Sequence, residues 1–303
     1  MSINWFGASG AARRMDEVKQ PREVILMERC TNSGSLLTVV EGEGTRALCL
    51  GTMSQTEAHV DSNGEVMLVP LVEEWVQCVV VISLAWLCDE AGSVLHCGVG
   101  GGIIPRALHE HTLSRSQCIE LEPEVLAAAQ SHFGLPAQND RFTASVGDAV
   151  ACLGLLARGN AGPNGEPRRF DVIIVDCFTA DGLAPAVADG EILPHLSACL
   201  RPSGVCLLNL FAPPTAAETI EEMPVIVELC KCFGAVYTLK VRSSQNVIAI
   251  CHHGPPRDGT AWAAHLAPAD ARAVSLCPDV TSERDLPSLD QRIVLVGGRG
   301  SQN

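Results

Sequence analysis

Three acidic residues, Glu120, Asp148 and Asp176, stand at the ends of short apolar runs that have the composition of buried β-strands. A glycine-rich segment, Gly98–Gly102, follows a fourth run in the same way. In an open α/β sheet, ligands bind in the crevice outside the carboxyl ends of the strands. Carboxylates at that edge accept hydrogen bonds from hydroxyl and amino groups. Together these features predict a nucleoside-binding site.

The spacing around the glycine-rich segment bears on which nucleoside is bound. Glycines after a buried strand let the backbone approach a ligand, and the following helix points its N-terminus there. Glu120 comes 22 residues after Gly98, which is typical of a ribose-binding carboxylate in a doubly wound fold. The dinucleotide fingerprint requires a further glycine at the position of Ile103. NAD is therefore the less favoured ligand, and a tight turn without a ligand is the alternative to both.

Strands that alternate with helices must position these residues, and this alternation predicts a parallel sheet with crossover connections. The predicted strands are Ser93–Cys97, Ser116–Leu121, Arg141–Val146, Phe170–Asp176, Gly204–Leu210 and a final hairpin of Val236–Val241 with Asn246–Cys251. The predicted fold class is α/β, with a doubly wound, mostly parallel, seven-stranded sheet. Three apolar runs between Glu23 and Leu50, separated by turn signals, predict a small N-terminal antiparallel β meander.

We divide the chain into a flexible leader (1–21), the β meander (22–66), a ligand-binding domain (67–254) and a C-terminal extension (255–303). Residues 69–89 are predicted to form a helix, on which Glu73 and Glu74 lie on a solvated face or, alternatively, line an entrance for a basic substrate. His252 and His253 are expected to face solvent. The alanine-rich segment 261–273 is predicted to be a helix on the sheet or a lid over the site.

Composition excludes several classes of function. The net charge of −14 repels phosphate backbones, so no nucleic-acid partner is expected, whereas a basic protein partner suits it. The longest apolar run, residues 78–88, is too short to span a membrane, for which about 20 residues are needed. Most of the 14 cysteines lie in apolar runs and none has zinc-site spacing, so we expect no metal and a reducing, cytoplasmic location.

The order of these motifs resembles the class I S-adenosylmethionine-dependent methyltransferases, and within them the spermidine-synthase-like branch. The resemblance rests on Gly98-x-Gly100-x-Gly102, Glu120, Gly147-Asp148-Ala149 and Asp176. It implies S-adenosylmethionine as cofactor, with Glu120 on the ribose hydroxyls and Asp148 on the adenine amino group. The cofactor-binding residues that it implies are Gln55, Gly98, Gly100, Gly102, Glu120, Leu121, Asp148, Ala149 and Asp176.

Further segments are similar to the C-terminal domain of the eukaryotic protein lysine and N-terminal methyltransferases that act on elongation factor 1-alpha. They include Gly98–Pro105, Ile119–Pro123 and Gly204–Leu210. This resemblance implies methyl transfer to an amine, with a protein as substrate. A homodimer is the assembly that the aminopropyltransferases of the same branch, which are often dimers, suggest. Asp176 is then the catalytic residue, which orients the amine and takes up charge with help from the carbonyl of Cys177. The alternative role for Asp176 is a strand-end cap or a cofactor contact only.

Two other functions stay open. Polyamine aminopropyltransferases share the scaffold, but their substrate loop carries a second acid three residues after the first, where this chain has Thr179, and Asp181 comes two places late. Their tyrosine motif before the cofactor domain also has no match, since Tyr237 is the only tyrosine. A non-catalytic, cofactor-binding scaffold is the second alternative.

Overall fold

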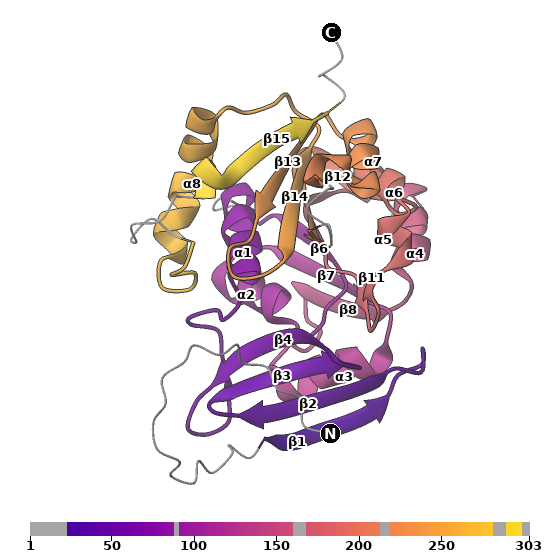
Figure 1. Ribbon diagram of the computed structural model, residues 1–303, viewed down its shortest axis with the longest axis vertical. Coiled ribbons are helices and arrows are strands. Elements are labelled where there is room, and N and C mark those ends of the chain that lie inside the picture. The colour runs from indigo at the N-terminus through magenta and orange to yellow at the C-terminus, as the bar shows by residue number, and fades with distance from the viewer. Residues whose placement is uncertain (1–22, 88–90, 160–167, 213–218, 281–288, 299–303) are drawn as a thin grey trace.

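The computed structural model describes residues 23–87, 91–159, 168–212, 219–280 and 289–298, so the predicted leader lies outside the described residues. The described chain forms an N-terminal antiparallel sheet and a larger sheet flanked by helices (Figure 1). Three bodies of apolar side chains hold these layers together.

The predicted N-terminal meander is present, with five strands in sequential order. They are β1 (Val24–Cys30), β2 (Leu36–Gly42), β3 (Thr45–Leu50), β4 (Met53–Val60) and β5 (Val66–Met67). In β3, buried and half-buried residues alternate, and Leu48 and Leu50 point into the core. The sequence did not reveal β4 as a strand because it is mostly polar and buries only Thr56 and Ala58.

The larger sheet has eight strands, so the predicted number of seven is wrong. Its order is β15-β13-β14-β12-β9-β6-β7-β8. The last five are parallel, and β14, β13 and β15 join by antiparallel pairs. The bounds are β6 (Ser93–Cys97), β7 (Arg115–Glu120), β8 (Phe142–Val146), β9 (Phe170–Val175), β12 (Leu200–Phe211), β13 (Ala235–Lys240), β14 (Asn246–His252) and β15 (Ile293–Gly297).

The unpredicted eighth strand is β15, which pairs with β13 at the edge of the sheet. Its apolar side chains are mostly half-buried or exposed, and some 40 residues separate it from the hairpin. Local sequence therefore gives no sign that this segment returns to the sheet, and residues 293–297 of the predicted C-terminal extension are part of it.

Helices cover both faces of the larger sheet, as a doubly wound fold requires (Figure 1). They are α1 (Glu74–Trp86), α2 (Ile103–His111), α3 (Pro123–His132), α4 (Ala149–Ala157), α5 (Pro185–Ala188), α6 (Leu193–Cys199), α7 (Pro224–Cys232), α8 (Gly259–Ala273) and α9 (Leu289–Arg292), with a 3₁₀ turn at Ile220–Glu222. In β9, Val172 and Ile174 pack toward α1 and α2, whereas Ile173 and Val175 pack toward α4 and α6. A short hairpin, β10 (Phe178–Thr179) with β11 (Gly182–Leu183), follows β9.

Two helices correct or narrow the predictions. The helix predicted over 69–89 begins only at Glu74: Pro70 disfavours a helical conformation at Val69, and Glu73 is extended as the N-cap residue. Its predicted end falls at positions 88–89, outside the described residues. The alanine-rich segment is the helix α8, which packs against α1 (Figure 1). None of its residues lines the cavity between the meander and the larger sheet, so it is not a lid over that cavity.

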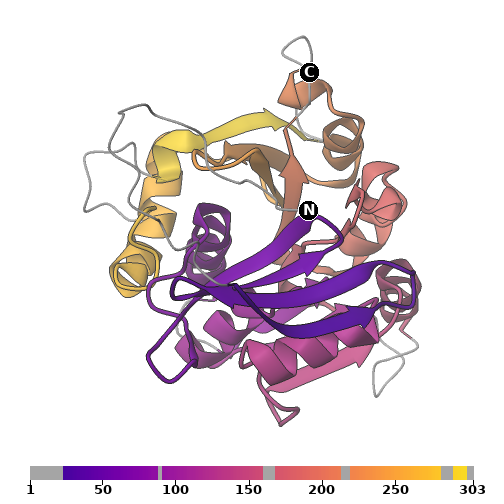
Figure 2. The ribbon, with the colours of Figure 1, turned by 60° about the horizontal axis from the view of Figure 1, so that its bottom comes forward.

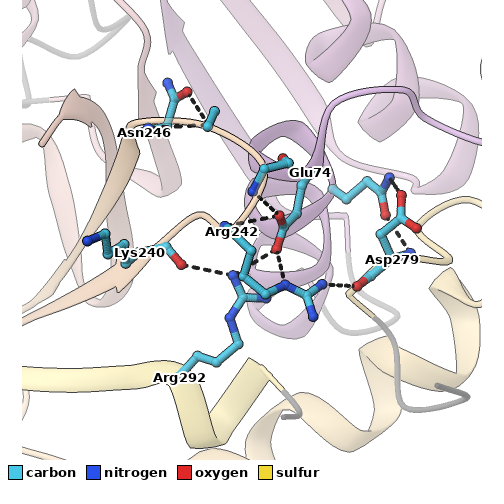
Figure 3. A network of polar contacts seen from close by, with 9 residues as sticks. Glu74, Lys240, Arg242, Asn246, Asp279 and Arg292 are labelled. Atoms are coloured by element: carbon cyan, nitrogen blue, oxygen red, sulfur yellow. Dashed lines mark hydrogen bonds and ion pairs between the residues drawn. The ribbon is translucent and has the colours of Figure 1, made fainter. Parts of the chain in front are cut away.

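Glu74 is buried, which corrects the expectation that it lies on a solvated face. Figure 3 shows the polar contacts around its carboxylate. Its carboxylate accepts hydrogen bonds from Arg242 Nε at 2.8 Å and forms an ion pair with Arg292 Nη2 at 2.8 Å. The backbone N–H groups of Arg242 and Ser243 donate to it as well. Burial alone would raise the pKa of this carboxyl, but these donors and cations hold it below its usual value. Glu74 thus connects the start of α1 to the β13–β14 turn and to the segment that enters β15.

Candidate cofactor-binding site

A cavity of about 450 Å³ opens between the carboxyl ends of the parallel strands and the meander. It is lined by eight of the nine predicted binding residues, namely Gln55, Gly98, Gly100, Glu120, Leu121, Asp148, Ala149 and Asp176. Leu48 and Leu50 of β3 complete the wall from the meander, which in Figure 2 lies across the end of the larger sheet beside α3. The cavity is therefore built by both sheets.

Gly102 is the predicted binding residue that does not line the cavity. It caps α2 with a positive φ of 76°, and a Cβ atom there would lie 2.6 Å from Leu135 Cδ1. Its glycine identity follows from this left-handed conformation and from close packing against the protein's own core.

The glycine loop is hydrogen-bonded to β7 on one side and to the meander, and it closely approaches the backbone that follows β9 on the other side. Gly98 has a φ of 84°, and a Cβ atom there would lie 2.1 Å from the backbone oxygen of Asp176. Gly101 N donates to Thr56 Oγ1 on β4 at 2.8 Å. Sequence reasoning assigned no role to Thr56, since nothing local shows that β4 reaches the loop.

Glu120 presents a fixed and buried carboxylate to the cavity. Its two oxygens accept hydrogen bonds from Val99 N at 2.8 Å and Glu122 N at 3.0 Å. Burial raises the pKa of this carboxyl, the two N–H donors oppose the rise, and the nearby Glu122 carboxylate adds to it. Since each oxygen has a second acceptor position, Glu120 can still accept bonds from a pair of neighbouring hydroxyls.

Asp148 caps the helix that begins beside the cavity. Its Oδ1 accepts a hydrogen bond from Ala151 N at 2.8 Å, in the first turn of α4. The cap leaves acceptor positions on the carboxylate for an amino group in the cavity, next to the backbone of Ala149.

Asp176 lies half-buried at the cavity wall and is held by a chain of amides. Asn209 Nδ2 donates to its Oδ1 at 2.9 Å, and Asn246 Nδ2 donates to Asn209 Oδ1 at 2.8 Å. Burial raises the pKa of Asp176 to about 6, the Asn209 hydrogen bond opposes the rise, and Glu120 adds to it. Neither asparagine was predicted, although an Asn inside the apolar run of β12 was a signal.

Glu122, the residue directly before α3, joins that helix to the meander. Its carboxylate accepts hydrogen bonds from the backbone N–H groups of Asn32, at 2.9 Å, and Ser33, at 3.2 Å. These residues form the β1–β2 turn, and Ser33 and Ser35 line the cavity. Glu122 therefore fixes the meander to the start of α3 rather than acting as a cap of that helix.

The loop after Asp176 contains no second buried acid. The Thr179 hydroxyl donates to Gly182 O at 3.3 Å and accepts from Asp181 N at 3.2 Å within the hairpin, and Asp181 is exposed at the rim. Cys177 Sγ donates to Cys97 O at 3.2 Å. Burial raises the pKa of the Cys177 thiol well above its usual value, so it stays protonated and is no nucleophile.

Three further observations concern the described part of the chain. No group of three or more His, Cys, Asp or Glu side chains in it is arranged to hold a metal ion. None of its helices combines the length and the apolar character that a membrane span requires. No disulfide bond joins the cysteines within these ranges.

A doubly wound sheet whose glycine loop and three strand-end carboxylates open into one cavity has the arrangement of α/β folds that bind nucleosides at the carboxyl ends of their strands. The chain matches no family model. It is 29% identical, over 171 residues, to the human eEF1A lysine and N-terminal methyltransferase, a match that covers 54% of this chain and 23% of that protein. It therefore spans less than a quarter of the length of that relative.

Two further proteins place the fold. The structure of human methyltransferase-like protein 13 in complex with SAH superposes with a TM-score of 0.57 and 22% identity, covering 71% of this chain and 96% of that one. A polyamine aminopropyltransferase of Chromobacterium violaceum is 25% identical over 184 residues, 60% of this chain and 64% of that protein. In sequence and fold, the chain is thus similar to class I methyltransferases of the spermidine-synthase-like branch.

Proposed function

We propose that this protein binds S-adenosylmethionine in the described cavity and transfers a methyl group to an amine of a protein. The observation that carries the proposal is the convergence of Glu120, Asp148 and Asp176 on one cavity beside the glycine loop. The names of the similar proteins, a lysine and N-terminal methyltransferase and a methyltransferase in complex with SAH, support the same chemistry.

The residues present fit this cofactor. A cavity of about 450 Å³ lies within the size range of small-molecule sites. Glu120, already oriented by two backbone donors, would hold the ribose hydroxyls. Asp148 would accept from the adenine amino group, with Leu121 and Ala149 along the base. Gln55 of β4 would approach from the meander side, opposite Gly98 and Gly100.

We assign catalysis to Asp176. When bound, S-adenosylmethionine supplies a methyl group on a sulfonium centre. An amine attacks such a centre only through its lone pair, so its proton must leave first. Asp176 has a pKa of about 6 and is mostly ionised at neutral pH, so it can accept an N–H hydrogen bond and aim the lone pair. Cys177 O already accepts from Ala184 N at 2.9 Å and has one acceptor position left for the same amine.

The acceptor and setting that we propose follow from charge and from the named relative. A net charge of −14 suits a basic protein substrate, and elongation factor 1-alpha is the named candidate. We further propose that the protein works in the cytoplasm, which agrees with the lack of disulfide bonds among the described cysteines. We also propose that it takes no nucleic-acid partner and that it can form a homodimer.

Aminopropyl transfer is disfavoured by the loop after Asp176. A diamine requires an anionic group at each cationic end. At the position of the second acid stands Thr179, whose hydroxyl is hydrogen-bonded within the hairpin turn, and the nearby Asp181 is exposed. One buried carboxylate is thus missing from the diamine site.

The first experiment is calorimetric titration with S-adenosylmethionine, its decarboxylated form and NAD, side by side. We expect the first to bind most tightly. Preference for the decarboxylated form would replace our proposal by aminopropyl transfer, and binding of none would leave only a scaffold.

Glu120→Ala should weaken binding more than Asp148→Ala, by about 1.5–3 kcal/mol for each charge-assisted hydrogen bond lost. Asp176→Asn should spare binding but depress methylation of lysate proteins; equal loss of binding would make Asp176 a cofactor ligand only.

A further inference from the structure

A second cavity, of about 380 Å³, lies at the opposite end of the strands, beside the start of β12. It is bounded by Ser203 near the start of β12, His252 at the end of β14, and Arg257, Asp258 and Ala261 around the start of α8, with proline side chains between them. Ser203 and Asn209 are six residues apart on β12, which corresponds to about 20 Å along the strand. This cavity is therefore separate from the one that contains Asp176.

Arg257 is a partly buried cation without a counter-ion among the described residues. Its guanidinium carbon lies 4.7 Å from the ring centre of Trp86 and 5.5 Å from that of Trp262. Its Nη1 is buried and has no hydrogen-bond partner. The Arg257 backbone is fixed, because its N–H donates to the Tyr237 hydroxyl. Burial lowers the pKa of Arg257, because the buried part of the guanidinium is removed from water.

His252 provides a second unpartnered polar atom at the same cavity. Its side chain is 4% exposed, which corrects the expectation that it faces solvent, and its Nε2 has no partner. Trp262 Nε1 and His265 Nε2, in the adjoining aromatic cluster, are also buried without a partner. A folded protein leaves few buried polar atoms unpaired, so four in one cluster require an explanation.

The chemistry of these groups selects the missing partner. A guanidinium has donors only, so its partner must be an acceptor, and planar guanidinium groups bind oxyanions through two parallel hydrogen bonds. Asp258 is the one carboxylate at the cavity among the described residues; it is exposed, and its Oδ1 accepts from Ala261 N at 2.9 Å. It therefore caps α8, and no ion pair joins it to Arg257. The cavity is larger than one oxyanion, and its proline walls suit a small organic body.

We propose that this cavity binds a phosphate group, as free phosphate or as the monoester of a small molecule, with Arg257 as its counter-ion. The site is independent of the proposed methyl transfer. Trp86 and Trp262, two of the four tryptophans of the chain, lie against the Arg257 guanidinium. Their fluorescence should therefore change when a ligand occupies the cavity.

The test is a fluorescence titration of the full chain with inorganic phosphate and with glycerol 2-phosphate, at constant ionic strength set by sodium chloride. We expect a saturable change in tryptophan emission, and tighter binding of the ester if an organic phosphate is the ligand. Arg257→Gln should weaken binding about 10- to 150-fold, the equivalent of one charge-assisted hydrogen bond. The control Arg115→Gln removes the same charge from an exposed position on β7 and should leave phosphate binding unchanged.

Two results of this titration would rule out a phosphate site at Arg257. A saturable response that Arg257→Gln leaves unchanged would overturn it, and so would the absence of saturation with both ligands. If Arg257→Gln does not fold, Arg257→Lys decides the matter: binding about tenfold weaker supports a guanidinium site, and unchanged binding overturns it. S-adenosylmethionine affinity, measured on the same samples, should stay constant, which separates this site from the proposed function.

Discussion

The hydrogen bond from Asn209 to Asp176 should set the pH at which the proposed catalytic carboxylate ionises. The perturbation that tests this is Asn209→Leu, which keeps a similar volume but removes the donor. A hydrogen bond to a charged group contributes about 1.5–3 kcal/mol, and one pKa unit corresponds to about 1.4 kcal/mol. Because water in the cavity can replace part of the bond to a half-buried carboxylate, we expect the lower limit, a rise of about one unit.

The consequence for ionisation follows directly. The pKa of Asp176 is about 6 in the native protein and should become about 7 in the variant. At pH 7 the ionised fraction then falls from about nine-tenths to about one-half, whereas above pH 8.5 the two proteins differ little. Methyl transfer should therefore decline as pH falls through about 6 in the native protein and through about 7 in the variant.

The assay is a ¹³C NMR titration of labelled aspartate carboxyl carbons, with Asp176→Asn used to assign the signal. Asn246→Ala is the matched control, because Asn246 donates to Asn209 and not to Asp176, and it should shift the titration by less than half as much. A native Asp176 that titrates near 4 would refute the argument from burial. An Asn209→Leu variant with an unchanged midpoint would refute the argument from the hydrogen bond.

Three further predictions concern how the site is held. Glu74→Gln should lower the free energy of unfolding in urea by about 3–5 kcal/mol, because a buried ion pair loses one partner. Since the pKa of Glu74 lies below its usual value, this contribution is present above about pH 4.5 and is lost as pH falls through the lowered pKa; an equal loss at every pH would contradict it. Glu122→Gln should speed amide exchange at Ser33, with a stability loss of about 1–3 kcal/mol, and unchanged exchange would show that the turn stands without this bond. Gly98→Ala should lower the melting temperature and abolish cofactor binding, because its Cβ would lie 2.1 Å from the Asp176 carbonyl; a variant that binds normally would disprove that close approach.

The sequence predicted those residues of the site whose positions depend on the strand directly before them. Glu120, Asp148 and Asp176 each follow a predicted strand, and the carboxyl ends of parallel strands lie at the same end of the sheet. The position of each acid after its strand is therefore enough to predict that the three carboxylates lie close together. The same reasoning gave the order of strand and helix through the parallel region and the final hairpin.

What the sequence did not reveal depends on contacts between distant segments. Its local sequence does not distinguish Glu74 from a surface residue. The structure shows that its carboxylate contacts Arg242 and Arg292, which are more than 160 positions away in the chain. In the sequence, Asn209 is a single polar residue in an apolar strand. The structure shows that it donates to Asp176 and accepts from Asn246. No periodicity encodes such pairings, because each residue satisfies its local pattern alone.

The hydrogen bond between Thr56 and Gly101, together with the cavity walls from Leu48 and Leu50, makes the meander a part of the binding site. Binding at the cavity and docking of the meander are then thermodynamically linked. A ligand that binds only the docked form stabilises it by RT ln(1 + [L]/Kd), about 2.7 kcal/mol at a hundredfold excess over Kd. The N-terminal sheet should accordingly resist proteolysis more strongly when the cofactor concentration is high, so that its exposure becomes a measure of cofactor supply.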